Sequence, residues 1–131
     1  MRGRQTGFSL VAVLVAITII GFVSLAVAPM FVLASRSNQS AAQVGRCSAL
    51  AMERMEQLRG TVLNNLVAGG SLAGNASGYV DTTQTGFVVR WRITDVVAPA
   101  GGKLIEVRSV SLRPSLGPGK QVTFAVLRVP G

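Results

Sequence analysis

Few side chains in this chain could carry out chemistry. There is no histidine, and there is a single cysteine, Cys47. The usual general base near neutral pH and the commonest zinc ligand are therefore missing. Glu53 and Glu56 are spaced three apart on a predicted helix, where a solvated face explains them better than acid–base catalysis. We therefore predict that the chain is not an enzyme, and we expect no cofactor.

Two short patterns resemble ligand-binding motifs, but neither is specific. Gly101-Gly102-Lys103 lacks the earlier glycine and the following Ser or Thr of a phosphate-binding loop. Trp91 stands between Arg90 and Arg92, which resembles an aromatic side chain set among basic ones in a nucleic-acid-binding surface. On a strand, however, alternation places Trp91 on the face opposite to the two arginines. We therefore expect Trp91 in the core.

The charge balance leaves one alternative open. The formal net charge is +8, from 13 Lys and Arg against 5 Asp and Glu. A basic protein can bind nucleic acid or other acidic surfaces. Beyond Arg2 and Arg4, the basic residues are spread from Arg36 to Arg128 without a dense cluster. A solvated surface is the preferred interpretation, and nucleic-acid binding remains the alternative.

The elements that carry these residues begin with an apolar segment. Phe8 to Ser35, a run of 28 residues, contains no charged side chain. As a helix it would span about 40 Å, more than a bilayer core requires. A secretory signal has a shorter apolar core, so that interpretation fits poorly. Residues 8–35 are therefore predicted to form a membrane anchor, with Arg2 and Arg4 holding the N-terminus in the cytoplasm.

The helix is predicted to continue through residues 36–67 as an amphipathic element. Its apolar residues follow steps of three and four, which places them on one stripe. These are Val44, Cys47, Ala51, Met55, Leu58, Val62 and Leu66. Cys47 and Met55 are predicted to be core residues. Glu56 and Arg59 are expected to pair at i,i+3. Gly60 weakens the prediction for the last two turns.

After a flexible glycine-rich loop at 69–78, the periodicity changes to two, which predicts antiparallel strands within 78–131. The clearest strand covers residues 87–94. A second is predicted from Leu104 to Arg113, with a bulge near Arg108–Ser109 where the apolar alternation slips. A third runs from Gln121 to Val129. Turns are predicted at 98–102 and 114–119. The sheet would cover the helix stripe and give an α+β fold.

Gly7 to Ala16 (GFSLVAVLVA) resembles the cleavage and assembly signature of type IV pilins and type II secretion pseudopilins. The resemblance implies that a prepilin peptidase cuts after Gly7 and methylates the new N-terminal Phe8. Gly21 and Pro29 fall where the family often places residues that loosen the helix, and proline itself favours a kink or local melting. Residues 49–59 and the strand pattern of 91–107 look most like V-type minor pilins and I-type pseudopilins.

The resemblance also implies a division of the chain and a set of partners. Residues 1–7 would be a leader, residues 8–35 the transmembrane and assembly half of the helix, and residues 36–131 a globular domain. The expected partners are other pilin or pseudopilin subunits, the prepilin peptidase, an inner-membrane assembly platform and the lipid bilayer. The chain would start in the bacterial inner membrane, with its C-terminal domain periplasmic, and then enter a pilus or pseudopilus.

One position departs from the family pattern. The family usually has a glutamate at the fifth residue after the cut, and here that residue is Ala12. The family carboxylate is held to pair with the N-terminal amine of a neighbouring subunit. Tip-initiating pseudopilins share its absence. The resemblance therefore suggests a position at or near a filament tip. Two alternatives remain: a pilin-like DNA-binding subunit of a DNA-uptake filament, and a plain single-pass anchor that never enters a filament.

Overall fold

The structure of the chain is a computed structural model that describes residues 6–97, 101–113 and 117–130. The chain divides into two compact units, Met1–Gln39 and Ser40–Gly131, and each is described by itself. Helix α1 (Thr6–Gly60) contributes to both. The predicted leader, apart from its last two residues, and parts of the predicted turns at 98–102 and 114–119 lie outside the described residues.

In the first unit, α1 is helical without interruption from Thr6 onward. Pro29 lies inside the helix, and neither Gly21 nor Pro29 interrupts it, so the local melting expected at Pro29 is not found. The Thr18 and Ser24 hydroxyls each donate to the carbonyl four residues earlier, at 2.8 Å. This satisfies both polar side chains within the helix itself.

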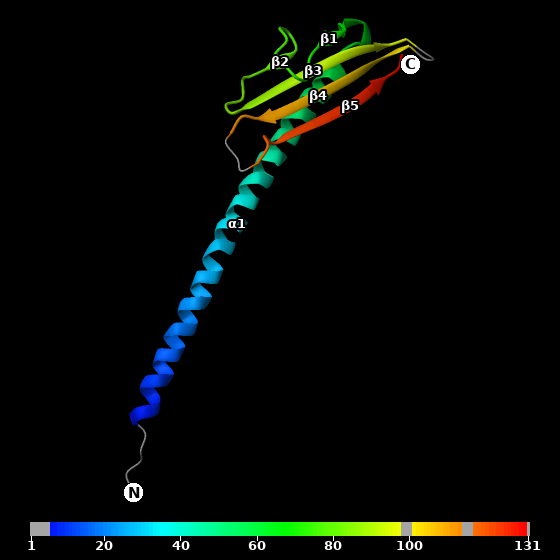
Figure 1. Cartoon of the computed structure of the whole chain (residues 1–131). Helices are drawn as coiled ribbons and strands as arrows, with labels where there is room; N and C mark the ends of the chain where they lie inside the picture. The colour runs from blue at the N-terminus through cyan, green and yellow to red at the C-terminus, as the bar shows by residue number, and fades with distance from the viewer. Residues whose placement is uncertain (1–5, 98–100, 114–116, 131) are drawn as a thin grey trace. The chain divides into compact units, whose positions relative to one another are not determined.

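The second unit contains an antiparallel sheet, as predicted. Its strands are β1 (Gly69–Gly70), β2 (Val80–Asp81), β3 (Phe87–Val96), β4 (Gly102–Ser111) and β5 (Gln121–Arg128). The order is β1-β3-β4-β5, and β2 also pairs with β3. The three long strands follow one another in the chain and lie side by side (Figure 1). They form the meander that the short predicted turns implied.

The core of this unit lies between the sheet and the second half of α1. Ala51, Met55 and Leu58 from the helix pack with strand residues into one buried cluster. The strand members are Val89, Trp91, Ile93, Ile105 and Val107. The prediction that the sheet covers the helix stripe is therefore confirmed for these helix residues, but it is wrong for Val62, which lies beyond the helix and is 63% exposed. Cys47 is fully buried, as expected, whereas Val44 is 40% exposed and lies at the margin.

The bulge predicted near Arg108–Ser109 is wrong. β3 and β4 pair in one continuous register, in which Arg90 faces Arg108 and Val89 faces Ser109. The inward positions of β4 continue from Ile105 and Val107 to two buried serines, Ser109 and Ser111. The apolar pattern shifts because these serines occupy core positions and Val110 lies on the other face, while the backbone alternation itself does not change.

The predicted end of the helix at residue 67 is also wrong. α1 ends at Gly60, and a short 3-10 turn, Leu63–Asn65, follows. Glycine disfavours continued helix, and the exposed helix-terminal carbonyls need other donors. Arg128 at the end of β5 supplies one: its Nη1 donates to the Leu58 carbonyl in the last turn at 3.4 Å and to the Thr61 carbonyl just beyond the helix at 2.6 Å. Leu66 is still buried, although it lies beyond the helix.

The glycine-rich loop contains a strand that the sequence did not predict. Gly69 and Gly70 form β1 and pair with Ile93 and Arg92. Gly70 has a positive φ of 91°, and a Cβ there would collide with the carbonyl oxygen of Trp91. Only glycine allows the backbone to approach β3 this closely.

Candidate functional site

The main feature of the first unit is the segment from Phe8 to Ser35, which contains no charged side chain. Every side chain from Ser9 to Gln39 is exposed in the isolated chain. α1 contains a stretch that is long and apolar enough to cross a membrane by length and composition. An apolar helix face of this size requires lipid or other protein as its surroundings. The segment therefore has the properties of an anchor that can also pack against other helices.

The predicted processing residues lie at the start of this helix. α1 begins at Thr6, so Gly7 and Phe8 fall in its first turn, and their side chains lie outside the description. Ala12 follows on the exposed part of the segment. No carboxylate occurs between Phe8 and Ser35, so the segment contains no group that could pair with an amine there.

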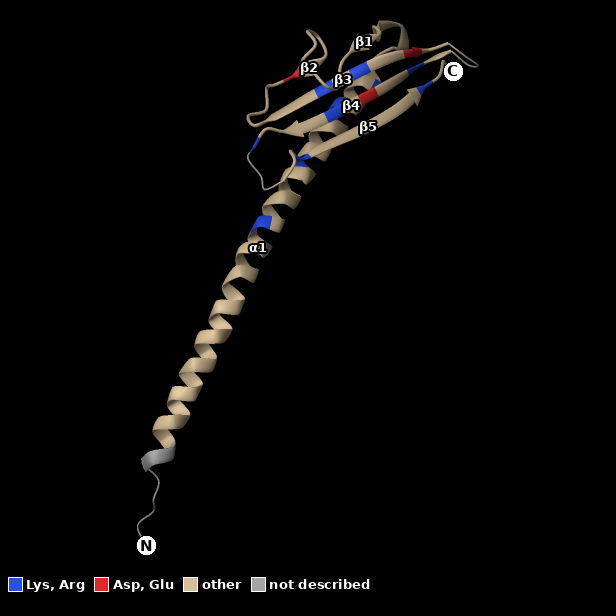
Figure 2. Cartoon of the chain, in the orientation of Figure 1, with Lys and Arg blue, Asp and Glu red and all other residues tan. Residues whose placement is uncertain are grey.

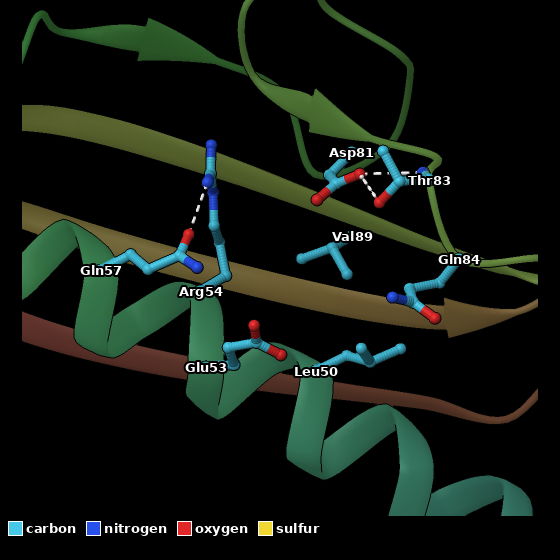
Figure 3. A pocket seen from close by; sticks show the side chains of 8 residues that line it. All are labelled: Leu50, Glu53, Arg54, Gln57, Asp81, Thr83, Gln84 and Val89. Atoms are coloured by element: carbon cyan, nitrogen blue, oxygen red, sulfur yellow. Dashed lines mark hydrogen bonds between the residues drawn. The ribbon is translucent and has the colours of Figure 1, made fainter.

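The second unit has a small pocket between the helix and the loop that joins β2 to β3 (Figure 3). Its volume is about 90 Å³, enough for a few water molecules. The lining consists of Leu50, Glu53, Arg54, Gln57, Asp81, Thr83, Gln84 and Val89. These residues include no histidine, cysteine or serine, and the one hydroxyl group of the lining belongs to Thr83.

Arg54 is the central side chain of this pocket. Its Nη1 donates to Gln57 Oε1 at 2.7 Å, and its guanidinium carbon lies 3.9 Å from the centroid of the Trp91 ring. The buried Nε has no hydrogen-bond partner among the described residues. The cation is thus held over the aromatic ring that closes the core. This arrangement stabilises packing and does not create a reactive group.

Asp81 lies across the pocket from the helix (Figure 3). The backbone N–H and the hydroxyl of Thr83 donate to its Oδ1 at 2.9 and 2.7 Å. These two hydrogen bonds, the backbone one first, lower the pKa of the Asp81 carboxyl, and the charge of Arg54 adds a smaller effect. Asp81 therefore remains an anion and is a poor proton donor.

Several other residues named in the sequence analysis take part in core packing or in ion pairs, and not in a binding site. Trp91 is buried and Arg92 is exposed, as alternation predicted. Arg59 and Glu56 form the predicted pair at 2.8 Å. Lys103, from the Gly101-Gly102-Lys103 pattern, forms an ion pair with Asp95 on the neighbouring strand and belongs to no phosphate-binding loop.

Sequence reasoning missed three relationships that the fold creates. These are the stacking of Arg54 on Trp91, the bond from Arg128 to the helix end, and the pairing of Arg90 with Arg108 across two strands. Each joins elements distant in the chain, so no local spacing indicates them. The pairing of Arg90 with Arg108 could have been predicted only if the register between β3 and β4 had been assigned first.

The comparisons with known proteins agree with the class that this arrangement defines. An apolar N-terminal helix whose second half packs on an antiparallel sheet is a pilin-like α+β fold. Residues 2–28 match the family described as "Prokaryotic N-terminal methylation motif". No curated protein and no solved structure matches the chain.

The chain therefore combines a prokaryotic N-terminal methylation motif at residues 2–28 with a pilin-like α+β fold. The combination of this motif with a pilin-like fold is typical of structural proteins. This motif is consistent with processing by a prepilin peptidase, assembly with other pilins and anchoring by the apolar helix before assembly.

Proposed function

We propose that the chain is a minor type IV pilin or a pseudopilin. In this role it is cut between Gly7 and Phe8, methylated on the Phe8 amine, and built into a pilus or pseudopilus. The observation that carries the proposal is the uncharged segment from Phe8 to Ser35, which begins at the methylation motif and is exposed from Ser9 onward. This segment suits both a lipid environment and a bundle of similar helices.

The mechanism that follows is mechanical. Arg2 and Arg4 hold the precursor's N-terminus at the cytoplasmic face, and the second unit faces the periplasm. Cleavage removes both cations together with the leader. The helix then leaves the lipid and packs among the helices of other subunits without burying a charged side chain.

Ala12 supports a placement at or near the filament tip. A carboxylate in lipid is costly, and it is normally kept only where it has a function. A subunit at the tip has a neighbour on one side only, so it requires no carboxylate for a further amine. Alanine at position 12 is therefore compatible with a position at the filament tip. It gives no support to abundant incorporation along the shaft.

The experiment that tests the proposal is mass spectrometry of the N-terminus of the protein isolated from its own cells. The wild type is expected to begin at Phe8, with a methylated amine. Gly7→Arg should leave the intact precursor in the membrane, because a long side chain beside the cut obstructs the peptidase.

Gly3→Arg is the matched control, since it makes the same change within the leader at a distance from the cut. It should be processed as the wild type is. An intact Met1 in the wild type, or a cut near Ala34, would refute the proposal and favour a plain anchor or a secretory signal instead.

A further inference from the structure

Two arginines face each other on the outer side of the sheet, away from the helix. Arg90 on β3 and Arg108 on β4 are direct cross-strand partners. Their neighbours along the strands, Trp91 and Val107, belong to the core, so the two arginines lie on the opposite face. Figure 2 shows the basic positions of the two strands side by side. Like charges directly opposite each other destabilise a sheet.

Neither arginine is neutralised by a carboxylate of the described chain. Arg90 Nε donates to Asn75 Oδ1 at 2.8 Å, and Arg108 Nε donates to Thr123 Oγ1 at 3.1 Å. Both acceptors are uncharged, and the ion pairs among the described residues involve neither arginine. The terminal N–H groups of both side chains are thus left available for an anion.

The adjacent cross-strand pair on the same face joins opposite charges. Arg92 and Glu106 are also cross-strand partners, and their ion pair has an N–O distance of 2.5 Å. The Glu106 side chain is only 17% exposed. The one carboxylate on this face is therefore already occupied by Arg92. The positive charge of Arg90 and Arg108 remains in excess beside a neutral pair.

We propose that Arg90 and Arg108 form a binding site for a carboxylate carried by a different subunit of the same filament. Arginine forks bind carboxylates through paired N–H donors, and arginine is enriched where interfaces gain most of their energy. The partner's charge would remove the repulsion between the two arginines. The inference rests on the proposed function as a filament subunit.

The surroundings of the pair favour a protein partner. Leu104 and Leu127 are cross-strand partners on the same face, and Leu127 is 54% exposed. Apolar side chains beside arginines are typical of protein interfaces. Among the described strand residues, none on this face is aromatic, so a platform for stacking bases is missing there. A second copy of this chain would place arginine against arginine, which excludes a symmetric contact through this pair.

The test uses the full chain purified in detergent and the other pilin subunits of the same filament, each purified in the same detergent. Arg90→Gln and Arg108→Gln should each weaken binding to one of these subunits by about tenfold or more. Both variants should keep the wild-type melting temperature or exceed it, because each relieves the repulsion. Arg46→Gln, which removes one exposed cation from the helix, is the control for net charge and should bind as the wild type does.

Unchanged binding by both glutamine variants would overturn the proposal, and so would a clear drop in their melting temperatures. A 20-base-pair DNA duplex is a further probe, at roughly physiological salt. Binding of that duplex by the wild type and not by the variants would assign the pair to nucleic acid and overturn the protein partner. The N-terminus is sequenced in the same preparations. A Phe8 terminus with unchanged subunit binding refutes only this inference, whereas an intact Met1 refutes the proposed function.

Discussion

The guanidinium carbon of Arg54 lies 3.9 Å from the centroid of the Trp91 ring, and so joins the helix to the central strand of the sheet. Such contacts are worth about 0.5–1 kcal/mol at exposed sites and about 2 kcal/mol when desolvated. Arg54 is half-buried and covers one side of the only tryptophan. Its contribution should lie between these limits.

Arg54→Ala is therefore expected to lower the free energy of unfolding by about 1–2 kcal/mol, and Arg54→Lys by less. Urea unfolding of the detergent-solubilised chain, followed by Trp91 fluorescence, measures the change. Arg59→Ala is the matched control, because the Arg59–Glu56 pair is exposed and should contribute only about 0.5 kcal/mol or less. Equal losses in both alanine variants would contradict a specific role for the stacking.

Substitution of Ser109 is expected to preserve or raise the free energy of unfolding, in contrast to substitution of Arg54. Its hydroxyl is fully buried and has no hydrogen-bond partner among the described residues. An unsatisfied buried polar group costs about 1–3 kcal/mol. Ser109→Ala should therefore leave the free energy of unfolding unchanged or raise it by about 1 kcal/mol. The urea midpoint is the measurement.

Ser111→Ala is the control for Ser109, since the Ser111 hydroxyl accepts a hydrogen bond from the Arg113 backbone N–H at 3.3 Å. This variant should lower the free energy of unfolding by about 0.5–1.5 kcal/mol. If Ser109→Ala loses as much as Ser111→Ala does, the Ser109 hydroxyl has a partner, and the prediction is wrong.

The ionisation of Asp81 should make the stability of the fold depend on pH in the acidic range. The hydrogen bonds from Thr83 lower the pKa of the folded carboxyl below its usual range, so the carboxylate stabilises the fold above the unfolded pKa of about 3.9. This contribution is lost as the pH falls through the lower, folded pKa. The urea midpoint of the wild type should therefore fall more steeply below about pH 4 than that of Asp81→Asn.

Thr83→Val separates the two hydrogen bonds to Asp81. It removes the hydroxyl donor and keeps the backbone N–H, so the pKa of Asp81 should rise part of the way toward its usual value. An NMR titration of the Asp81 carboxyl measures this shift directly. An identical acid dependence in the wild type and Asp81→Asn would show that the Thr83 bonds contribute nothing to stability.

A chain that starts at Ser37 should be a folded, soluble monomer. It omits the uncharged segment and retains the core formed by the second half of α1 and the sheet. The expected results are one cooperative unfolding transition by Trp91 fluorescence and a monomeric mass by light scattering. Aggregation of this chain, together with a well-folded full chain, would show that the helix stripe needs a further partner to cover it.

Ala12→Glu tests the placement in the filament. The new carboxylate could pair with a neighbour's amine and allow entry along the shaft, whereas at the tip it lacks that partner and is costly if charged. The variant should be tolerated or redistributed, and Ala12→Gln, which adds similar bulk without the charge, should keep the wild-type location. Quantitative labelling of purified filaments measures the location. Abundant, even labelling of the shaft by the wild type would exclude the tip.

Much of the fold could be predicted because it depends on local patterns. The burial of Trp91 follows from alternation, and the burial of Met55 follows from helical spacing. The bulge was predicted wrongly because polar residues occupy strand positions that face the core. Ser109 and Ser111 occupy inward positions that the pattern expects to be apolar, which made a regular strand look bulged.

The candidate sites also differ in whether the sequence alone could predict them. The methylation motif is contiguous in the sequence, so residues 2–28 were recognisable without a structure. The pair Arg90 and Arg108 depends on the register between β3 and β4, and the residues of the pocket around Arg54 come from three separate segments. Such sites can be predicted only after the strands have been aligned.

The uncharged segment from Phe8 to Ser35 has an energetic consequence beyond its length. It contains no ionisable side chain, so sliding it along the membrane normal moves no side-chain charge through the transmembrane potential and does almost no electrical work. On transfer from lipid to a helical bundle, its side chains also take up and release no proton. The Phe8 amine that cleavage would create is the ionisable group of this segment, so the membrane potential and the pH gradient would act on the mature helix through its N-terminus and not through its side chains.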